Sequence, residues 1–246
     1  MDRMLYVAMT GARQTMQSQA MTANNLANIS TRGFRADLAA MRSMPLYGEG
    51  LPTRVFSMTE RAGIDFNHGT LESTDRELDV AIQGDGFFAV QSNDGTEAYT
   101  RAGDFRISSA GILQTGNGLP VLGENGPISV PQAKNILFGS DGTISIRPND
   151  ANANEITQFD RLKLVKPALN NLEKGLDGLF RLKGPGNVIA DPTVKVVPGA
   201  LETSNVNAAT ELVNMIEHAR QFEMQTKMMQ AADENEQRAA QILQLA

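Results

Sequence analysis

The sequence predicts an α+β protein, in which long N- and C-terminal helices pair as a coiled coil beside a central all-β domain. Three observations support this. Both ends repeat apolar residues at helical spacing, the middle alternates in short runs between glycine turns, and methionine is absent from residues 59–214. The predicted parts are an N-terminal helix at 1–28, an extended connector with some strand at 29–75, a central β-domain at 76–198, and a C-terminal helix at 199–246.

The N-terminal segment has the spacing of a coiled-coil helix. Residues 2–28 contain no proline, and steps of four and three separate the members of one seam. The polar residues on its other faces are mostly neutral amides, whereas an exposed helix normally carries Glu and Lys. We therefore expect this helix to be surrounded by protein. The seam consists of Leu5, Met9, Ala12, Met16, Gln19, Ala23 and Leu26.

The C-terminal segment repeats this pattern and runs without glycine or proline after Gly199. Ser204 or Asn205 is expected to cap the helix, and Asp233 and Glu236 interrupt the seam, which should loosen there. One alternative is an amphipathic helix packed on its own domain; the other is pairing of the two terminal helices. The seam consists of Leu212, Met215, Ala219, Phe222, Thr226 and Met229, and, after the interruption, of Ala240 and Leu243.

The placement of methionine favours pairing and subunit assembly. None of the 12 methionines falls in residues 59–214. Methionine is flexible and suits surfaces that adapt to more than one neighbour. Core filling alone also uses methionine, but it would not leave the whole middle of the chain without it.

The middle of the chain predicts hairpins, because short alternating runs are separated by turns such as "NDG" at 93–95 and "GNG" at 116–118. Gly84-Asp85-Gly86 resembles the start of a phosphate loop, but the third glycine is missing and the chain continues as strand. Gly84 and Gly86 are therefore interpreted as a structural turn that needs the backbone freedom of glycine, with Asp85 facing the turn.

The composition is poor in cysteine and histidine, two residue types that often catalyse reactions or bind metals. A net charge of -6 argues against a nucleic-acid partner, and no apolar run approaches the roughly 20 residues that span a bilayer. There is no cysteine, and His68 and His218 lack metal-site spacing, so both are interpreted as ordinary surface histidines. We predict no catalytic, cofactor-binding or metal-binding residues. The N-terminus lacks the pattern of a secretory signal peptide.

Three asparagines crowd the end of the first seam: Asn24, Asn25 and Asn28, followed by Gly33 and Phe34. A capped helix end explains the glycine as a turn but does not explain the asparagines. Side-chain amides both donate and accept hydrogen bonds. We expect them to satisfy backbone groups at a corner where helices of several subunits converge.

Several stretches together resemble the rod, hook and hook-associated axial proteins of the bacterial flagellum. The segment "ANNLANISTRGF" at 23–34 is similar to the N-terminal signature of that family. The segments "LDVAIQGDGFFAV" at 78–90 and "YTRAGDFRISSAGILQTGNGLPVLG" at 99–123 resemble its central β-domain motif. The segment "GALETSNVNAATELVNMIEHARQFE" at 199–223 resembles its C-terminal motif.

The resemblance implies a structural subunit of the proximal rod, with the distal rod or another axial protein as the alternative. It implies paired terminal helices as an inner layer, with 24–34 as the corner to the outer parts. The implied partners are other copies, neighbouring rod proteins and the flagellar type III export apparatus. The implied location is the periplasm-spanning rod of the basal body, reached without a cleaved signal peptide.

Two other classes stay open. A wall-degrading enzyme needs a catalytic constellation, and none is found in the sequence. A free-standing binding module on the β-domain would show a deep pocket with convergent polar groups.

Overall fold

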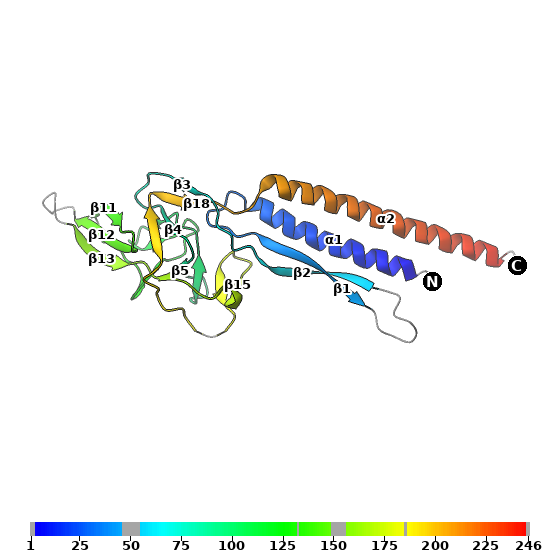
Figure 1. The fold of residues 1–246 in the computed structure, drawn as a ribbon, viewed down its shortest axis with the longest axis horizontal. Helices are drawn as coiled ribbons and strands as arrows, with labels where there is room; N and C mark the ends of the chain where they lie inside the picture. The colour runs from blue at the N-terminus through cyan, green and yellow to red at the C-terminus, as the bar shows by residue number, and fades with distance from the viewer. Residues whose placement is uncertain (1–2, 46–54, 132, 149–155, 185, 245–246) are drawn as a thin grey trace. The chain divides into compact units, whose positions relative to one another are not determined.

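The computed structural model describes residues 3–45, 55–131, 133–148, 156–184 and 186–244, and the chain forms two compact units. The helical unit contains residues 1–29, 36–65 and 206–246, and the β unit contains residues 30–35 and 66–205. Helices at both ends and many strands between them confirm the predicted α+β class (Figure 1).

The helical unit consists of two helices and a hairpin. Helix α1 (Arg3–Ala27) and helix α2 (Ala208–Gln244) lie side by side and run antiparallel (Figure 1). Their side chains meet near the C-terminal end and at the middle of α1, because Asn25 contacts Glu211 and Thr15 contacts Gln225. Strands β1 (Asp37–Pro45) and β2 (Val55–Ile64) form an antiparallel pair with a bulge between Leu38 and Ala39.

The face of α1 that is buried within the chain is lined by small and polar side chains. They are Ala8, Ala12, Thr15, Ser18, Thr22 and Asn25. Gln225 of α2 lies so close to Gly11 that an added Cβ would stand 2.9 Å from its Nε2. The predicted apolar seam is therefore not the packing face of the single chain. Small side chains allow the two helices to approach closely, which Leu5, Met9 and Met16 would prevent.

Helix α2 begins later than predicted. Asn207 caps it, since its Oδ1 accepts from the backbone N–H groups of Ala209 and Thr210 at 3.0 and 3.2 Å. The predicted caps, Ser204 and Asn205, are therefore wrong. Beyond Ala232 the side chains of residues 233–241 are all exposed.

Strand β2 packs on α1 through polar contacts at Thr59. Its backbone N–H donates to Gln14 Oε1 at 2.7 Å, and its hydroxyl lies 3.3 Å from that of Ser18. The neutral polar face of the helix thus provides acceptors for a strand of the same chain. The connector predicted at 29–75 is divided in the structure. Residues 36–65 belong to the helical unit, and 66–75 belong to the β unit.

The β unit contains a five-stranded sheet in the order β14-β5-β6-β16-β15, a three-stranded sheet β11-β12-β13, and four two-stranded pairs, β17-β4, β18-β3, β7-β8 and β10-β9. The 3-10 helix η1 (Leu169–Asn171) precedes β15. The strands are β3 (Leu71–Ser73), β4 (Val80–Gln83), β5 (Phe87–Gln91), β6 (Glu97–Thr100), β7 (Arg106–Ile107), β8 (Leu113–Gln114), β9 (Leu122–Gly123), β10 (Gly126–Pro127), β11 (Ala133–Phe138), β12 (Thr143–Pro148), β13 (Thr157–Arg161), β14 (Leu164–Val165), β15 (Leu172–Lys174), β16 (Phe180–Leu182), β17 (Lys195–Pro198) and β18 (Ala200–Glu202).

One apolar core holds these small sheets together. Phe88 and Phe105 meet edge to face at 5.1 Å between ring centroids, and Ile82, Leu113 and Ile128 are fully buried around them. Strand β18 pairs with β3, so residues 200–202 belong to this unit rather than to the predicted C-terminal helix.

Three turns of the β unit share an Asp-x-Thr arrangement. Asp94, Asp141 and Asp191 each accept from the backbone N–H and the hydroxyl of the threonine two residues later, the hydroxyl at 2.7, 2.7 and 2.6 Å. The threonine hydroxyl is the main cause that holds the pKa of each carboxyl below its ordinary value of 3.8.

These turns should make the β unit sensitive to acid. Because the folded pKa values are lowered, the stabilisation is present above about pH 4 and is lost as pH falls through them. A triple variant, Asp94→Asn, Asp141→Asn and Asp191→Asn, keeps an accepting oxygen but no charge. Its melting temperature should fall less between pH 5 and pH 2 than that of the wild type. Equal falls would contradict this role.

The predicted turn at Gly84 and Gly86 has left-handed backbone, with φ of 76° and 144°. The two glycines differ in their surroundings. A Cβ on Gly86 would lie 2.7 Å from Val194 Cγ1, while a Cβ on Gly84 would meet no atom within 4 Å. Backbone strain applies to both positions, and crowding applies only to Gly86.

Replacement of these glycines should therefore have graded effects. Gly84→Ala should lower the free energy of unfolding by about 1 kcal/mol, and Gly86→Ala should lower it by more, up to about 3 kcal/mol. Gly184→Ala is the matched control, because a Cβ there meets open space and the backbone is not left-handed. Urea unfolding measures all three. A cost for Gly84→Ala equal to that of Gly86→Ala would contradict the crowding argument.

Candidate functional site

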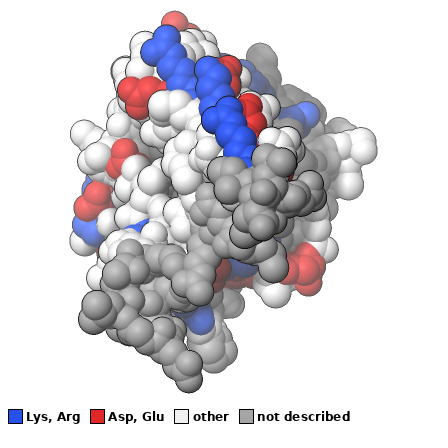
Figure 2. All heavy atoms as spheres, turned by 90° about the vertical axis from the view of Figure 1, so that its right-hand side faces the viewer, with Lys and Arg blue, Asp and Glu red and all other residues white. Residues whose placement is uncertain are grey.

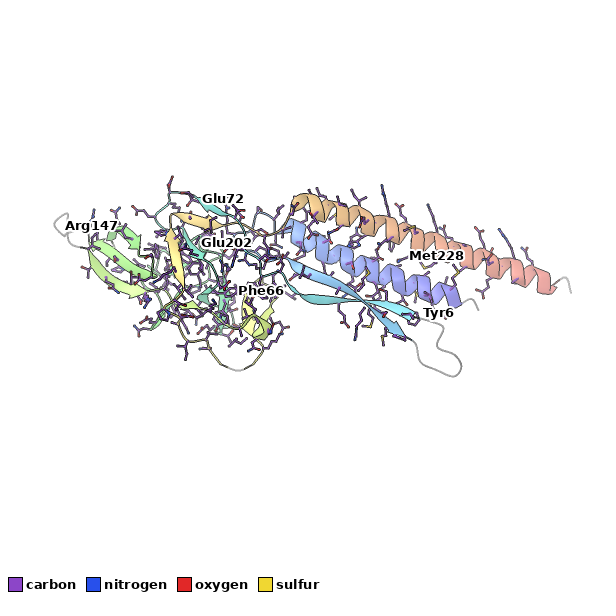
Figure 3. All side chains as sticks on the ribbon, in the orientation of Figure 1. Tyr6, Phe66, Glu72, Arg147, Glu202 and Met228 are labelled. Carbon is purple, nitrogen blue, oxygen red and sulfur yellow. The ribbon has the colours of Figure 1, made fainter. Side chains whose placement is uncertain are left out.

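The helical unit exposes large apolar side chains. On α1, Tyr6 and Met9 are each 52% exposed and Met16 is 57% exposed, and on α2 Ile216 and Met224 are 54% and 57% exposed. In Figure 3, Tyr6 and Met228 lie on the helices of this unit. The side of the molecule drawn in Figure 2 shows charged side chains of both signs beside an uncharged area. Large apolar residues outside and small residues inside are the reverse of a helix pair that is complete on its own.

The predicted assembly residues fall into three groups. Six are exposed: Leu5, Met9, Met16, Ala23, Asn24 and Leu212. Six are partly buried: Leu26, Asn28, Met215, Ala219, Phe222 and Met229. Four are buried: Ala12 and Asn25 in the helical unit, and Gly33 and Phe34 in the β unit.

The three asparagines of the predicted corner have different roles. The side chain of Asn25 donates to the carbonyl of Asp37 at 3.0 Å and accepts from its N–H at 2.9 Å, as a neighbouring strand residue would. It also donates to Glu211 at 3.2 Å. Asn28 donates to the carbonyl of Asn24 at 2.9 Å. Asn25 thus joins α1, β1 and α2 of one chain.

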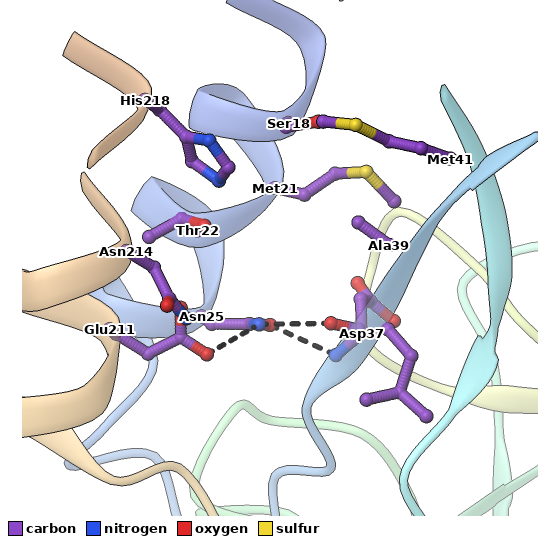
Figure 4. Close-up of a pocket in the computed structure, with 11 residues that line it drawn as sticks. Ser18, Met21, Thr22, Asn25, Asp37, Ala39, Met41, Glu211, Asn214 and His218 are labelled. Atoms are coloured by element: carbon purple, nitrogen blue, oxygen red, sulfur yellow. Dashed lines mark hydrogen bonds between the residues drawn. The ribbon is translucent and has the colours of Figure 1, made fainter. Parts of the chain in front are cut away.

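A cavity of about 280 Å³ lies next to Asn25, between α1, β1 and α2 (Figure 4). Its wall combines apolar residues such as Met21 and Met41 with polar ones that include Asn214 and His218. The buried Nδ1 of His218 has no hydrogen-bond partner among the described residues, so the surface interpretation of this histidine is wrong. A free-standing binding module would have its pocket in the β-domain. The cavity described here lies in the helical unit instead.

The β unit contains a buried cluster of charges that the sequence did not indicate. Glu202 Oε1 accepts from Arg35 Nη2 at 2.6 Å, and Glu202 Oε2 accepts from Arg101 Nε at 2.6 Å. All three side chains are at most 2% exposed. Figure 3 marks Glu202 among the strands of this unit. Burial lowers the pKa of Arg101 below its ordinary value, and Glu202 acts in the opposite direction.

Arg101 also fixes the turn between β4 and β5. Its Nη1 donates to the carbonyls of Gly84 and Gly86 at 2.9 and 2.8 Å. The prediction that Asp85 faces the turn is wrong, because its carboxylate pairs with Lys166 at 3.1 Å and with His68 at 3.3 Å. The Lys166 hydrogen bond holds the pKa of Asp85 below its ordinary value.

Arg35 also contacts His68, whose Nδ1 is 3.4 Å from Arg35 Nη2. Since a guanidinium only donates, this contact requires the tautomer in which Nδ1 accepts and Nε2–H points to Asp85. Lys174 donates to the carbonyl of Arg35 at 2.7 Å and lies 3.7 Å from the centre of the Phe34 ring.

Gly33 is required by the same cluster. Its φ is 65°, and a Cβ on it would collide with the backbone carbonyl of Arg101. The sequence could have indicated this cluster, because each of its three charged residues stands within or directly beside one of the quoted family motifs. A charged residue is normally solvated, so it carries no such signal by itself.

Among the described residues, no group of three or more His, Asp or Glu side chains is arranged to hold a metal ion. Within the same ranges, neither helix contains an apolar stretch long enough to cross a lipid bilayer.

Three family models match the chain in the order expected of one axial protein. They are described as flagella basal body rod protein (residues 5–35), flagellar hook protein FlgE/F/G D1 domain (81–146), and flagellar basal body rod FlgEFG protein C-terminal (197–242). The described contacts join all three, since Arg35, Arg101 and Glu202 lie one in each.

Curated relatives match along the whole chain. The flagellar basal-body rod protein FlgF of Escherichia coli K12 is 47% identical over 253 residues, covering 100% of both chains. FlgF of Buchnera aphidicola subsp. Schizaphis graminum is 33% identical, covering 98% of both, and FlgG of Bacillus subtilis is 32% identical, covering 95% of this chain and 96% of the relative. The chain therefore belongs to the flagellar basal-body rod protein family and is FlgF-like.

Proposed function

We propose that this protein is a structural subunit of the proximal rod of the bacterial flagellar basal body. It assembles with other copies and with neighbouring rod proteins into the axial shaft that transmits torque. It reaches the periplasm-spanning rod through the flagellar export apparatus, without a cleaved signal peptide. No reaction and no cofactor form part of this function.

The exposed apolar side chains of α1 and α2 are the observation that supports this proposal. A chain that keeps small residues inside a helix pair and large ones outside gains most of its apolar burial only with further partners. Leu5, Met9 and Met16 have the spacing of a coiled-coil seam, and in the assembly they pack against helices of other subunits.

Repetition of one such contact gives a shaft. A contact between two different faces of identical subunits gives a ring if its rotation closes and a helix of subunits if it does not, and a shaft requires the second case. The exposed end of α2, residues 233–241, carries charged, amide and alanine side chains instead of large apolar ones, so the apolar contact surface lies on the part of the helix before it. Stiffness then comes from many apolar contacts per subunit.

Deletion of the coding sequence in its own bacterium tests the function directly. The strain should lose swimming, should lack complete basal bodies in electron micrographs, and should recover both with a plasmid copy. Normal swimming of the deletion strain would refute the proposal. Cleavage of purified cell wall by the isolated protein would instead support the enzyme class.

A single exposed methionine tests the proposed interface. Met16→Asp should change the free energy of unfolding of the purified monomer by no more than about 0.5 kcal/mol, because the side chain at this position is already exposed to water. In the cell it should abolish swimming, since a carboxylate buried in an apolar interface costs several kcal/mol. Met16→Leu is the matched control and should swim. Normal swimming of Met16→Asp would place this face outside the interface.

A further inference from the structure

The chain passes between its two units four times: after Ile29, after Arg35, after Asp65 and after Asn205. Three stretches of the β unit are therefore joined covalently to the helical unit. They are residues 30–35, the stretch that begins at Phe66, and the stretch that ends at Asn205. A force on the helices is transmitted through the backbone to the β unit along these three stretches.

Glu202 lies in the stretch that ends at Asn205 and makes hydrogen bonds to the other two. Its carbonyl accepts from the N–H of Gly33 at 2.9 Å, and its Oε1 accepts from Arg35 at 2.6 Å and from the N–H of Gly69 at 2.9 Å. The stretch that contains Glu202 is also bonded to the first stretch, since the N–H of Asn205 donates to the carbonyl of Phe34 at 3.3 Å.

The other carboxylate oxygen of Glu202 connects these stretches to the core. It accepts from Arg101, whose guanidinium also donates to the carbonyls of Gly84, Gly86 and Ile82 at 2.9, 2.8 and 3.3 Å. Ile82 belongs to β4 and is 1% exposed in the apolar core. One carboxylate therefore connects every stretch that the helices pull on to a strand of the core.

We propose that Arg35, Arg101 and Glu202 form a mechanical clamp, called here the Glu202 clamp, which holds the three joining stretches so that torque passes into the β unit without loosening them. This inference rests on the proposed function, because only a torque-bearing subunit needs such a clamp. Charge-assisted bonds suit the task, since they are short and directional, and burial protects them from screening by salt.

Native-state hydrogen exchange on the purified full-length chain tests the clamp. The variants are Glu202→Asp, which keeps the charge but shortens the side chain, and Glu202→Gln, which removes the charge. The matched control is Glu97→Gln. The side chain of Glu97 is also buried in the β unit, at 7% exposed, and among the described residues it forms its ion pair with Lys163 at 2.8 Å, outside the joining stretches.

The amides to follow are those of Gly33 and Asn205. Both bond to backbone carbonyls, of Glu202 and Phe34, which the substitutions leave in place. Faster exchange there reports release of the stretch and not loss of its own acceptor. The amides of Val121 and Ile128, bonded within the core, are the internal reference.

Both Glu202 variants should speed exchange at Gly33 and Asn205 at least ten-fold more than at Val121 and Ile128, and Glu97→Gln should not. Equal acceleration of all four amides in both Glu202 variants would assign the cluster to the stability of the whole unit and overturn the clamp. The clamp would also be overturned if Glu97→Gln accelerates exchange at the Gly33 amide as much as Glu202→Asp does.

Swimming under load tests the mechanical role. Cells with Glu202→Asp should assemble basal bodies but lose at least half of their swimming speed in viscous medium relative to wild type, whereas Glu97→Gln cells should not. If Glu202→Asp accelerates exchange at the Gly33 amide but the cells swim at normal speed in viscous medium, the mechanical role would be overturned. The exchange result does not depend on the rod, so a deletion strain that swims would refute the proposed function and leave the exchange result standing.

Discussion

The burial of one carboxylate between two guanidinium groups is the constraint on which the β unit depends. Glu202 is 2% exposed and forms ion pairs with both Arg35 and Arg101 at 2.6 Å each. Removal of one partner from such a pair costs about 3–5 kcal/mol, because the remaining charge stays buried without compensation. That cost is comparable to the whole stability of many domains, about 5–15 kcal/mol. The cluster therefore restricts which residue types can occupy the neighbouring positions.

Its effects on the sequence extend well beyond the three charged residues. Gly33 has no side chain because the backbone of Arg101 occupies the place of a Cβ. The backbone carbonyls of Gly84 and Gly86 both accept hydrogen bonds from the guanidinium of Arg101. Helix α2 starts six residues after Glu202, so the chain passes from the buried cluster into the helix within a short stretch. The local motif residues are thus explained by one tertiary interaction.

The sequence predicted the existence and approximate bounds of both helices, because proline-free apolar periodicity is a local signal. It did not predict which face of α1 is buried. The positions 8, 12, 15, 18, 22 and 25 also follow steps of four and three, so two faces satisfy the same pattern. Apolar content favoured the face of large residues, whereas the packing of two helices within one chain selected the face of small ones. The buried cluster was missed because its members are up to 167 positions apart.

The two features together separate folding from assembly within one chain. The β unit folds around its own apolar core and the charged cluster, whereas the face of α1 that is buried within the chain is lined by small and polar side chains. The large apolar side chains of the helices are left outside the monomer. Rod proteins assemble with other rod components, and in this helical unit the small and polar contacts join α1 to its own chain while the large apolar side chains stay available to neighbours. All described methionines lie in this unit, and the flexible side chain of methionine suits surfaces that adapt to more than one neighbour.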